Sequence, residues 1–408
     1  MQRLAIRGVD TLIKDIPSSN SVTLSLFLDV GLPLELDDEV GMSHFLEHMC
    51  FRGTKRRTSY EITKEIDSLG GIINAYTTKE FTCYYITVLP EYINEALDIL
   101  VDIVFFSTHV TESIELEKSI ITEEINMYED TPDDKIIDLL NFQLFKGFHL
   151  GKPILGTVDS ISKFNPKKLK RYYENYFYKD NIKLVVAGAI GSLDTVTNTI
   201  KSNFDVIPFA SSSKLEKDCL LPQYESSIKN VTKDLEQMHL CYGFPGLEYN
   251  SDDRYALTLL TTLMGGSMSS RLFQSVRERA GLAYSIYCSA SFYRQAGGVI
   301  IYAGTSNDNF LKAQECIDSE LQLLKKGISD DEFDRTLRQL KGNIMIHLEG
   351  SSAWANWLGR QLIYNSGLTT MDELQSRLNS ITKRNVVDLI DSIFLGDIKV
   401  NVSLGSHS

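Results

Sequence analysis

The segment His44-Phe45-Leu46-Glu47-His48 places two imidazoles four residues apart, with a carboxylate directly before the second. On an α-helix, residues i and i+4 lie on the same side about one turn apart, so His44 and His48 can bind one metal ion. Glu47 can reach the same space, where its carboxylate could take a proton from a bound water. Two satisfied histidines and a surface glutamate on an ordinary buried helix would give the same short pattern. A third protein ligand decides between these interpretations, because a catalytic zinc site normally has three such ligands and one open position.

The acidic segment 111–134 supplies candidates for that ligand. On a helical wheel of about 100° per residue, Glu117 and Glu124 fall between two apolar arcs, in the middle of the face predicted to be buried. The arcs consist of Leu116, Ile120 and Met127 on one side and of Ile114, Ile121 and Ile125 on the other. Glu112, Glu115, Glu123 and Glu129 project outside this face. A carboxylate facing a core costs several kcal/mol unless it is paired or bound to a metal, so the two inward glutamates indicate a site.

We therefore assign Glu124 as the third ligand and Glu117, two turns earlier, as a supporting carboxylate. The wheel also separates the adjacent pair, since Glu123 points away from the predicted buried face. Two imidazoles among three ligands favour zinc over Mg²⁺ or Ca²⁺, which prefer oxygen. The sequence thus predicts one zinc ion per chain, held by His44, His48 and Glu124.

The order of predicted elements occurs twice along the chain. Residues 21–48 read as a strand, a glycine, an acidic turn and a helix, and residues 237–264 repeat that order. A short helix, a Gly-containing turn, two strands and a long helix follow each copy. The second strand of each pair and the long helix are predicted at 82–88 and 91–106 in the first copy, and at 298–303 and 308–326 in the second. A period of nearly 200 residues indicates duplicated domains rather than a solenoid.

These repeats predict the domain boundaries. We expect an N-terminal zinc-binding domain over 1–210, a polar linker over 211–228 and a homologous C-terminal domain without a metal site over 229–408. The mixture of hairpins and adjoining helices favours α+β domains over a doubly wound parallel sheet.

The composition excludes several classes of partner. Hydrophobic residues make up 43% and charged residues 23% of the 408, the balance of a soluble globular protein. No apolar run reaches about 18 residues, and the N-terminus lacks the features of a signal or transit peptide, so we expect a cytoplasmic protein without a membrane span. The net charge of −13 argues against nucleic acids and anionic membranes as partners. Six scattered cysteines without a CxxC pair are expected to be reduced thiols.

Three stretches of the chain resemble the pitrilysin, or inverted zinc-binding, metallopeptidase family, which includes insulin-degrading enzyme and the mitochondrial processing peptidase. "HFLEHMCFRGTKRR" is similar to the HxxEH helix of that family. "GGIINAYTTKEFTCYY" is similar to its strand beside the active site, and "MGGSMSSRLFQSVRERAGLAYSIY" to the second-repeat segment that places an arginine and a tyrosine against the substrate. These last two residues correspond to Arg277 and Tyr284.

The resemblance implies a zinc endopeptidase made of two α+β domains, each an antiparallel sheet with flanking helices. Glu47 would be the general base, Glu117 would tune the zinc ligands, and the edge strand around Asn74 and Ala75 would hold an extended peptide by main-chain hydrogen bonds. The second repeat has "YALTLLTTLM" where the first has its histidines, so it should bind no zinc. Family proteins of this length resemble processing-peptidase subunits that pair to enclose a chamber. We expect a homodimer, with a heterodimer of two similar subunits as the alternative.

Two other functions stay open at this point. A non-catalytic partner or scaffold subunit of a heteromeric peptidase would usually lack one ligand or the base, whereas all four residues are present here. A zinc enzyme acting on a substrate other than a peptide would need a small closed pocket rather than a strand-lined chamber.

Overall fold

The computed structural model describes residues 1–207, 209 and 221–406, which form two compact units. The first unit comprises the described parts of Met1–Ile125, Pro153–Asp218 and His347–Leu368, and the second those of Asn126–Lys152, Cys219–Ile346 and Thr369–Ser408. Each unit therefore takes one segment from the opposite half of the chain, an exchange that the continuous boundaries 1–210 and 229–408 do not include. Most of the predicted linker, 211–228, lies outside the described residues.

The first unit is built on a six-stranded sheet of order β1-β2-β6-β3-β5-β4. Its strands are β1 Gln2–Ile6, β2 Val9–Asp15, β3 Val22–Leu28, β4 Ile72–Thr77, β5 Thr82–Val88 and β6 Ile182–Gly188. All residues of β3 are buried, and all of β6 except Lys183 are too, which explains the continuous apolar character of these central strands. β4 lies at the edge and pairs only with β5 among the described strands.

The second unit repeats this topology with five strands in the order β7-β11-β8-β10-β9. They are β7 Ser227–Thr232, β8 Gln237–Pro245, β9 Ala283–Phe292, β10 Gly297–Ser306 and β11 Val400–Gly405. Strand for strand, this order matches β2-β6-β3-β5-β4, and the single parallel pair of each sheet occupies the same place, β2 with β6 and β7 with β11. The predicted duplication and the predicted strands at 82–88 and 298–303 are confirmed.

Helices cover both faces of each sheet. The helices of the first unit are α1 Met42–Met49, α2 Ser59–Ser68, α3 Ile93–Phe105, most of α4 Thr111–Glu129, α6 Val158–Ser162, α7 Pro166–Tyr176, α8 Leu193–Phe204 and α12 Ser351–Ile363. Those of the second are α5 Pro132–Leu144, α9 Arg254–Gly265, the π-helical turn η6 Phe273–Arg279, α10 Phe310–Leu323, α11 Asp330–His347, α13 Met371–Ser380 and α14 Lys383–Leu389. The long helices predicted near 91–106 and 308–326 are α3 and α10.

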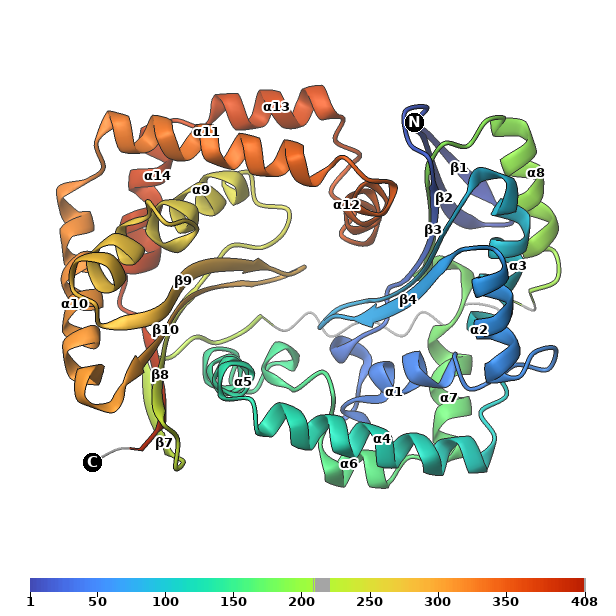
Figure 1. Cartoon of the computed structure of the whole chain (residues 1–408), viewed down its shortest axis with the longest axis horizontal. Helices are drawn as coiled ribbons and strands as arrows, with labels where there is room; N and C mark the ends of the chain where they lie inside the picture. Colours follow the sequence, from blue (N-terminus) through green and yellow to red (C-terminus); the bar gives the residue numbers. More distant parts are fainter. Residues whose placement is uncertain (208, 210–220, 407–408) are drawn as a thin grey trace. The chain divides into compact units, whose positions relative to one another are not determined.

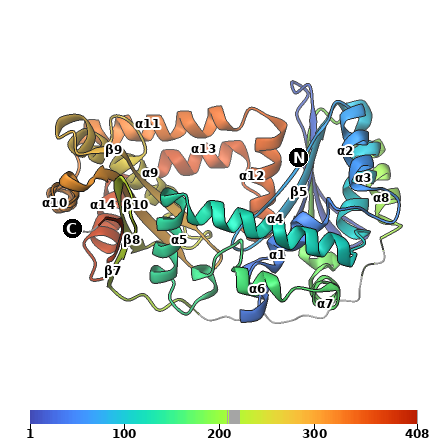
Figure 2. The ribbon, with the colours of Figure 1, turned by 60° about the horizontal axis from the view of Figure 1, so that its bottom comes forward.

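One helix on each sheet comes from the exchanged segment. In the first unit, α3 and α8 lie on one side of the sheet and α12 lies on the other, against β3 and β6 (Figures 1 and 2). In the second unit, α5 packs in the same way against β8 and β11, opposite α9. Gly359 of α12 is buried directly against the Phe27 ring of β3, where a Cβ atom would lie 2.0 Å from a ring carbon.

The predicted α+β class with two tandem repeats is confirmed, and each sheet, expected to be antiparallel, also contains one parallel pair. The five cysteines in the described part of the chain are free thiols; Cys219 lies outside it. Among the described helices, none combines the length and apolar character needed to cross a bilayer.

Candidate metal centre

The histidine motif forms the short helix α1, whose first turn is fixed by two local features. Gly41 precedes the helix with φ +93°, a left-handed conformation that favours glycine, and a Cβ atom there would lie 2.7 Å from Gly156 Cα. The buried carboxylate of Glu35 accepts hydrogen bonds from the backbone N–H groups of Gly41 (2.8 Å) and Ser43 (2.9 Å). A carboxylate at this end of a helix satisfies free donors and complements the helix dipole. The orientation of His44 and His48 is therefore set by a capped, buried turn.

Helix α4 carries both predicted carboxylates toward α1. Glu117 is 1% exposed and lies on the same face as the buried Ile114 and Ile121, as predicted. Glu124 is turned toward the histidines, with a side chain 33% exposed, whereas Glu123 is exposed, so the wheel separated this pair correctly.

One of the two apolar arcs was predicted wrongly. Leu116, Ile120 and Met127 are 52%, 38% and 67% exposed, so only the arc of Ile114, Ile121 and Ile125 packs into the core. The buried face of α4 is consequently narrower than the wheel indicated, and Glu124 lies at its margin rather than its middle.

His44, His48 and Glu124 come together as a three-donor cluster, with one ligand atom from each lying within 4.8 Å of the others. His44 Nε2 is 3.9 Å from Glu124 Oε1, and His48 Nε2 is 3.7 Å from Glu124 Oε2. A tetrahedral zinc with bonds of about 2.0–2.2 Å keeps its donors roughly 3.4 Å apart, so these separations are close to what the ion requires. Burial lowers the pKa of His44 to about 3, which leaves it in the neutral form that binds metals. The residues thus fit a zinc ion by donor type and spacing, and His44 fits it by protonation as well.

Glu117 orients His48 from the side opposite the cluster. Its Oε1 lies 2.7 Å from His48 Nδ1, and its Oε2 accepts a hydrogen bond from the Arg52 guanidinium. Burial raises the pKa of Glu117, but the bonds to His48 and Arg52 outweigh burial and hold it below its usual range. An ionised Glu117 accepts the Nδ1–H of His48 and so leaves Nε2 free for the metal, the arrangement by which carboxylates fix metal-binding histidines.

Protonation of His48 competes with metal binding. Burial lowers the pKa of His48, but the hydrogen bond and charge of Glu117 outweigh it, so the pKa is raised. The Nδ1 of His44, in contrast, is buried without a hydrogen-bond partner among the described residues.

Glu47 lies beside the cluster and is fixed by Thr77 at the end of β4. The Thr77 hydroxyl donates to Glu47 Oε2. Burial raises the pKa of Glu47 above its ordinary value, despite the hydrogen bond that lowers it. The charge of His48 lowers the pKa of Glu47, and the charge of Glu124 raises it. A buried carboxylate with a raised pKa next to a metal-ligand set can accept a proton and release it again.

The remaining predicted residues lie on the edge strand β4 of the first unit and, in the second unit, on the π-helical turn η6 and the edge strand β9. Asn74 is exposed and Ala75 partly exposed on β4, and the Ala75 N–H donates to the Asn74 side-chain oxygen (2.8 Å). In the second unit, the Arg277 guanidinium lies 4.6 Å from the centre of the Phe273 ring and 5.2 Å from that of Tyr284. Tyr284, the second residue of β9, is 80% exposed.

Two residues that contact the predicted site residues escaped the sequence prediction. Arg52 is the fourth residue after His48, within the quoted motif, and Thr77 lies within the quoted strand segment. The available signal for Arg52 was a basic residue four positions after His48, close enough in sequence to reach a carboxylate that contacts this histidine. For Thr77, the contact with Glu47 depends on where β4 lies relative to α1, which no local pattern specifies. Among the described residues, the second unit contains no cluster of metal-ligand side chains.

The fold and the site together define a class of proteins. Its members are two-sheet α+β proteins with an inverted HxxEH helix and a glutamate from a following helix. Residues 10–158 match the family model described as "Insulinase (Peptidase family M16)", and residues 163–340 match that described as "Peptidase M16 inactive domain". The chain belongs to this family, the pitrilysin-type M16 metallopeptidases.

Several relatives are similar over almost their full length. The chain is 37% identical to an uncharacterized zinc protease, YmxG, of Bacillus subtilis, covering 96% of this chain and 94% of the relative. It is 33% identical to an uncharacterized zinc protease of Streptomyces coelicolor, covering 93% and 84%.

Two solved structures share the fold. A protease from Helicobacter pylori superposes with a TM-score of 0.93 at 20% identity, covering 99% of this chain and 98% of the other. A protein described as a peptidase M16 inactive domain, from Pseudomonas fluorescens, gives 0.90 at 19% identity, covering 100% and 98%.

Proposed function

We propose that this protein is a zinc-dependent endopeptidase that hydrolyses peptides or unfolded polypeptide segments bound as extended strands. The observation that carries the proposal is the convergence of His44, His48 and Glu124 with a buried, hydrogen-bonded Glu47 beside them. The zinc protease names of the relatives agree with this donor set.

Each residue of the centre has a defined task in this proposal. His44, His48 and Glu124 hold the ion, which when bound lowers the pKa of a coordinated water toward neutrality and polarises a carbonyl oxygen. Glu47 accepts the proton of the attacking water and passes it to the leaving amine, a task helped by its raised pKa. Thr77 keeps the Glu47 carboxylate in one orientation, and Glu117 keeps His48 in the tautomer that binds metal.

Substrate would be bound through its main chain. β4 is an edge strand that ends at Thr77, the residue that contacts Glu47, so a peptide added to its free edge would run toward the base. Main-chain pairing tolerates many side chains, which suits a peptidase acting on unfolded segments. We include Arg277 and Tyr284 as substrate contacts, supported by their stacking at the exposed start of β9 and by their motif. We also propose that a chamber closes around the peptide and that the protein is a homodimer in the cytoplasm. Analytical ultracentrifugation of the purified chain tests the assembly.

A non-catalytic subunit is the second candidate, since one solved relative of similar fold is described as an inactive domain. In this chain, the description "inactive domain" matches residues 163–340, which exclude every residue of the metal centre. The complete set of ligands and base favours the catalytic function.

The substitution Glu47→Gln tests the proposed chemistry directly. The amide has nearly the same shape but cannot take up a proton, so we expect stoichiometric zinc to be retained and cleavage of a quenched peptide library to fall by about 10²–10⁴-fold. Glu95→Gln, at an exposed position of α3, controls for the loss of one charge and should leave cleavage unchanged. Cleavage near the wild-type rate in Glu47→Gln would exclude it as the base. Wild-type protein that binds zinc but cleaves no peptide would favour the non-catalytic subunit.

A further inference from the structure

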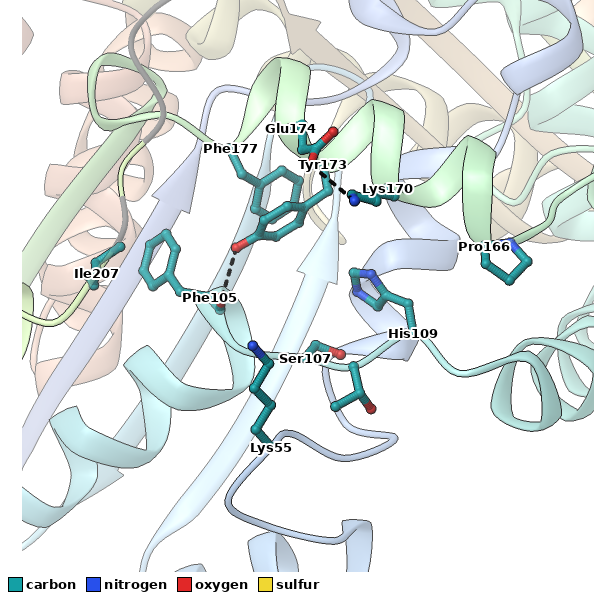
Figure 3. Close-up of a pocket in the computed structure, with 11 residues that line it drawn as sticks. Lys55, Phe105, Ser107, His109, Pro166, Lys170, Tyr173, Glu174, Phe177 and Ile207 are labelled. Carbon is teal, nitrogen blue, oxygen red and sulfur yellow. Dashed lines mark hydrogen bonds and ion pairs between the residues drawn. The ribbon is translucent and has the colours of Figure 1, made fainter.

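The first unit contains a cavity of about 540 Å³ whose lining includes none of the proposed metal ligands (Figure 3). Its wall is formed by the end of α3, the loop before α4, helix α7, Ile207 and one residue of the loop after α1. A volume of this size suits a small organic ligand rather than a single ion.

One side of the cavity is aromatic. Phe105, Tyr173 and Phe177 line it, and the last two rings are stacked with centroids 4.4 Å apart. The Tyr173 hydroxyl already donates to the backbone oxygen of Phe105 (3.1 Å), as Figure 3 shows, so the residue offers its ring rather than its donor. This wall favours an apolar or aromatic body.

The other side carries polar groups that lack partners. His109 Nε2 is buried and has no hydrogen-bond partner among the described residues, and the His109 backbone has φ +45°, an uncommon conformation for a residue other than glycine. Burial lowers the pKa of His109 to about 4, so the ring is neutral near pH 7 and can donate one N–H. Nε2 itself has almost no surface that a water-sized group can reach, so a ligand in the cavity would accept its hydrogen bond from the other ring nitrogen, Nδ1.

The cavity is lined by one lysine whose positive charge no described carboxylate offsets. Lys55 is exposed and forms no ion pair or hydrogen bond with any residue that the structure describes, whereas Lys170 is offset by Glu174 at 3.7 Å. An unpaired ammonium and a neutral imidazole N–H together suit a carboxylate, which accepts from both.

The loop that lines this cavity is tied to both helices of the metal centre. The Ser107 hydroxyl donates to the backbone oxygen of Met49, the last residue of α1 (2.9 Å), and Ser107 forms a β-bridge with Thr54. Two residues after His109, the same loop begins α4, which carries Glu117 and Glu124. A molecule in the cavity that shifts this loop therefore also shifts α1 and α4, the helices that carry the proposed metal-binding residues.

We propose that this cavity binds a small carboxylate with an apolar or aromatic body and that its occupancy changes zinc affinity at the metal centre. The carboxylate is held by Lys55 and His109, and the body lies against the aromatic wall. Two sources share this chemistry: a free organic acid and the C-terminal residue of a peptide. Binding itself is independent of the proposed peptidase function, whereas the coupling rests on the proposed zinc site.

Calorimetric titration of the zinc-loaded protein tests binding, with 3-phenylpropionate for the free acid, N-acetylphenylalanine for the peptide end and 3-phenylpropionamide as the uncharged control. We expect an acid to bind at least about tenfold more tightly than the amide. Lys55→Gln should weaken acid binding about fivefold, and Lys64→Gln, an exposed lysine of α2, should not. His109→Asn should weaken it too, and asparagine tolerates the same backbone conformation. The acid that binds more tightly identifies the source. Absence of acid binding at millimolar concentration, equal binding of acid and amide, or equal affinities in the two lysine variants overturns the proposal.

The coupling is measured without any peptide substrate. Chelator competition gives the zinc affinity with and without a saturating amount of the tighter acid, and titration of the zinc-free protein gives the reciprocal effect. We expect both factors to agree and to be about fivefold or more. Equal acid affinity for zinc-loaded and zinc-free protein would overturn the coupling while leaving the binding site, and it would leave the peptidase proposal unaffected.

Discussion

At the scale of single residues, the orientation of His48 and Glu47 depends on neighbours that do not bind metal. Glu117 is hydrogen-bonded to His48, Arg52 donates to Glu117 and lowers the pKa of its carboxyl, and Thr77 donates to Glu47. Such outer partners convert a set of suitable donors into a site with one defined geometry. Glu117 is almost fully buried, so its charge depends strongly on the two bonds it makes.

Arg52→Met should weaken zinc binding by about 10–100-fold. Glu117 loses the cation that favours its ionised form, and a protonated Glu117 holds His48 less firmly. Competition with a chromogenic chelator gives the affinity. Arg56→Met is the matched control, since Arg56 pairs with the more exposed Asp98 and not with Glu117; we expect little change there. Partial recovery in Arg52→Lys would support a role of the charge. Equal zinc affinities in Arg52→Met and Arg56→Met would show that Arg52 does not act through Glu117.

The clustering of His44, His48 and Glu124 could be predicted from the sequence because the information for it is local. Spacing on a helix placed His44 and His48 together, and a wheel separated Glu124 from Glu123. It could not show that the arc of Leu116, Ile120 and Met127 stays exposed, because a wheel reveals which residues share a face but not what covers it. The contacts of Arg52 and Thr77 were missed for a related reason, since they arise where separate elements meet.

At the scale of elements, the proposed substrate site depends on the position of β4 at the edge of its sheet. Asn74 and Ala75 pair with Tyr85 and Tyr84 of β5 on one side, and the opposite side of β4 has no neighbouring strand among those described. The Ala75 N–H is meanwhile bonded to the Asn74 side chain, which limits the exposure of an unpaired edge donor.

Replacing Ala75 with proline should remove the edge N–H that a bound peptide would use. We expect kcat/KM for peptides to fall by about tenfold or more with zinc content unchanged, since one main-chain hydrogen bond and the strand geometry around it are lost. Ala75→Gly retains the N–H and serves as the control. Equal kcat/KM for the two variants would exclude main-chain pairing at this position.

At the scale of the whole molecule, two repeats of one topology exchange a helix-bearing segment. α12 covers the first sheet and α5 the second, although each lies in sequence within the other half of the chain. An apolar helix face predicts burial but not the sheet on which it is buried, so the exchange could not be predicted from the repeat alone. The duplication itself, in contrast, could be predicted from the repeated order of elements, although the order of the strands within each sheet could not.

Gly359→Ala tests the packing of α12. The added methyl group would overlap the Phe27 ring, so we expect the urea midpoint to fall, by an amount equivalent to about 1–3 kcal/mol of unfolding free energy. Gly342→Ala makes the same change in α11 where no atom lies within 4 Å, and helix propensity predicts a gain of up to about 1 kcal/mol there. Equal midpoints for the two variants would contradict this close contact.

The assignment of the metal centre is tested most directly by comparing Glu124→Gln with Glu123→Gln, two identical changes at adjacent positions of α4. We predict that Glu124→Gln loses most of its zinc and its peptide cleavage, because a neutral amide is a poor third ligand, while Glu123→Gln keeps stoichiometric zinc and wild-type cleavage. Elemental analysis and a quenched-peptide assay on the same preparations give both quantities. Full zinc occupancy in Glu124→Gln, or equal loss in both variants, would contradict the proposed centre.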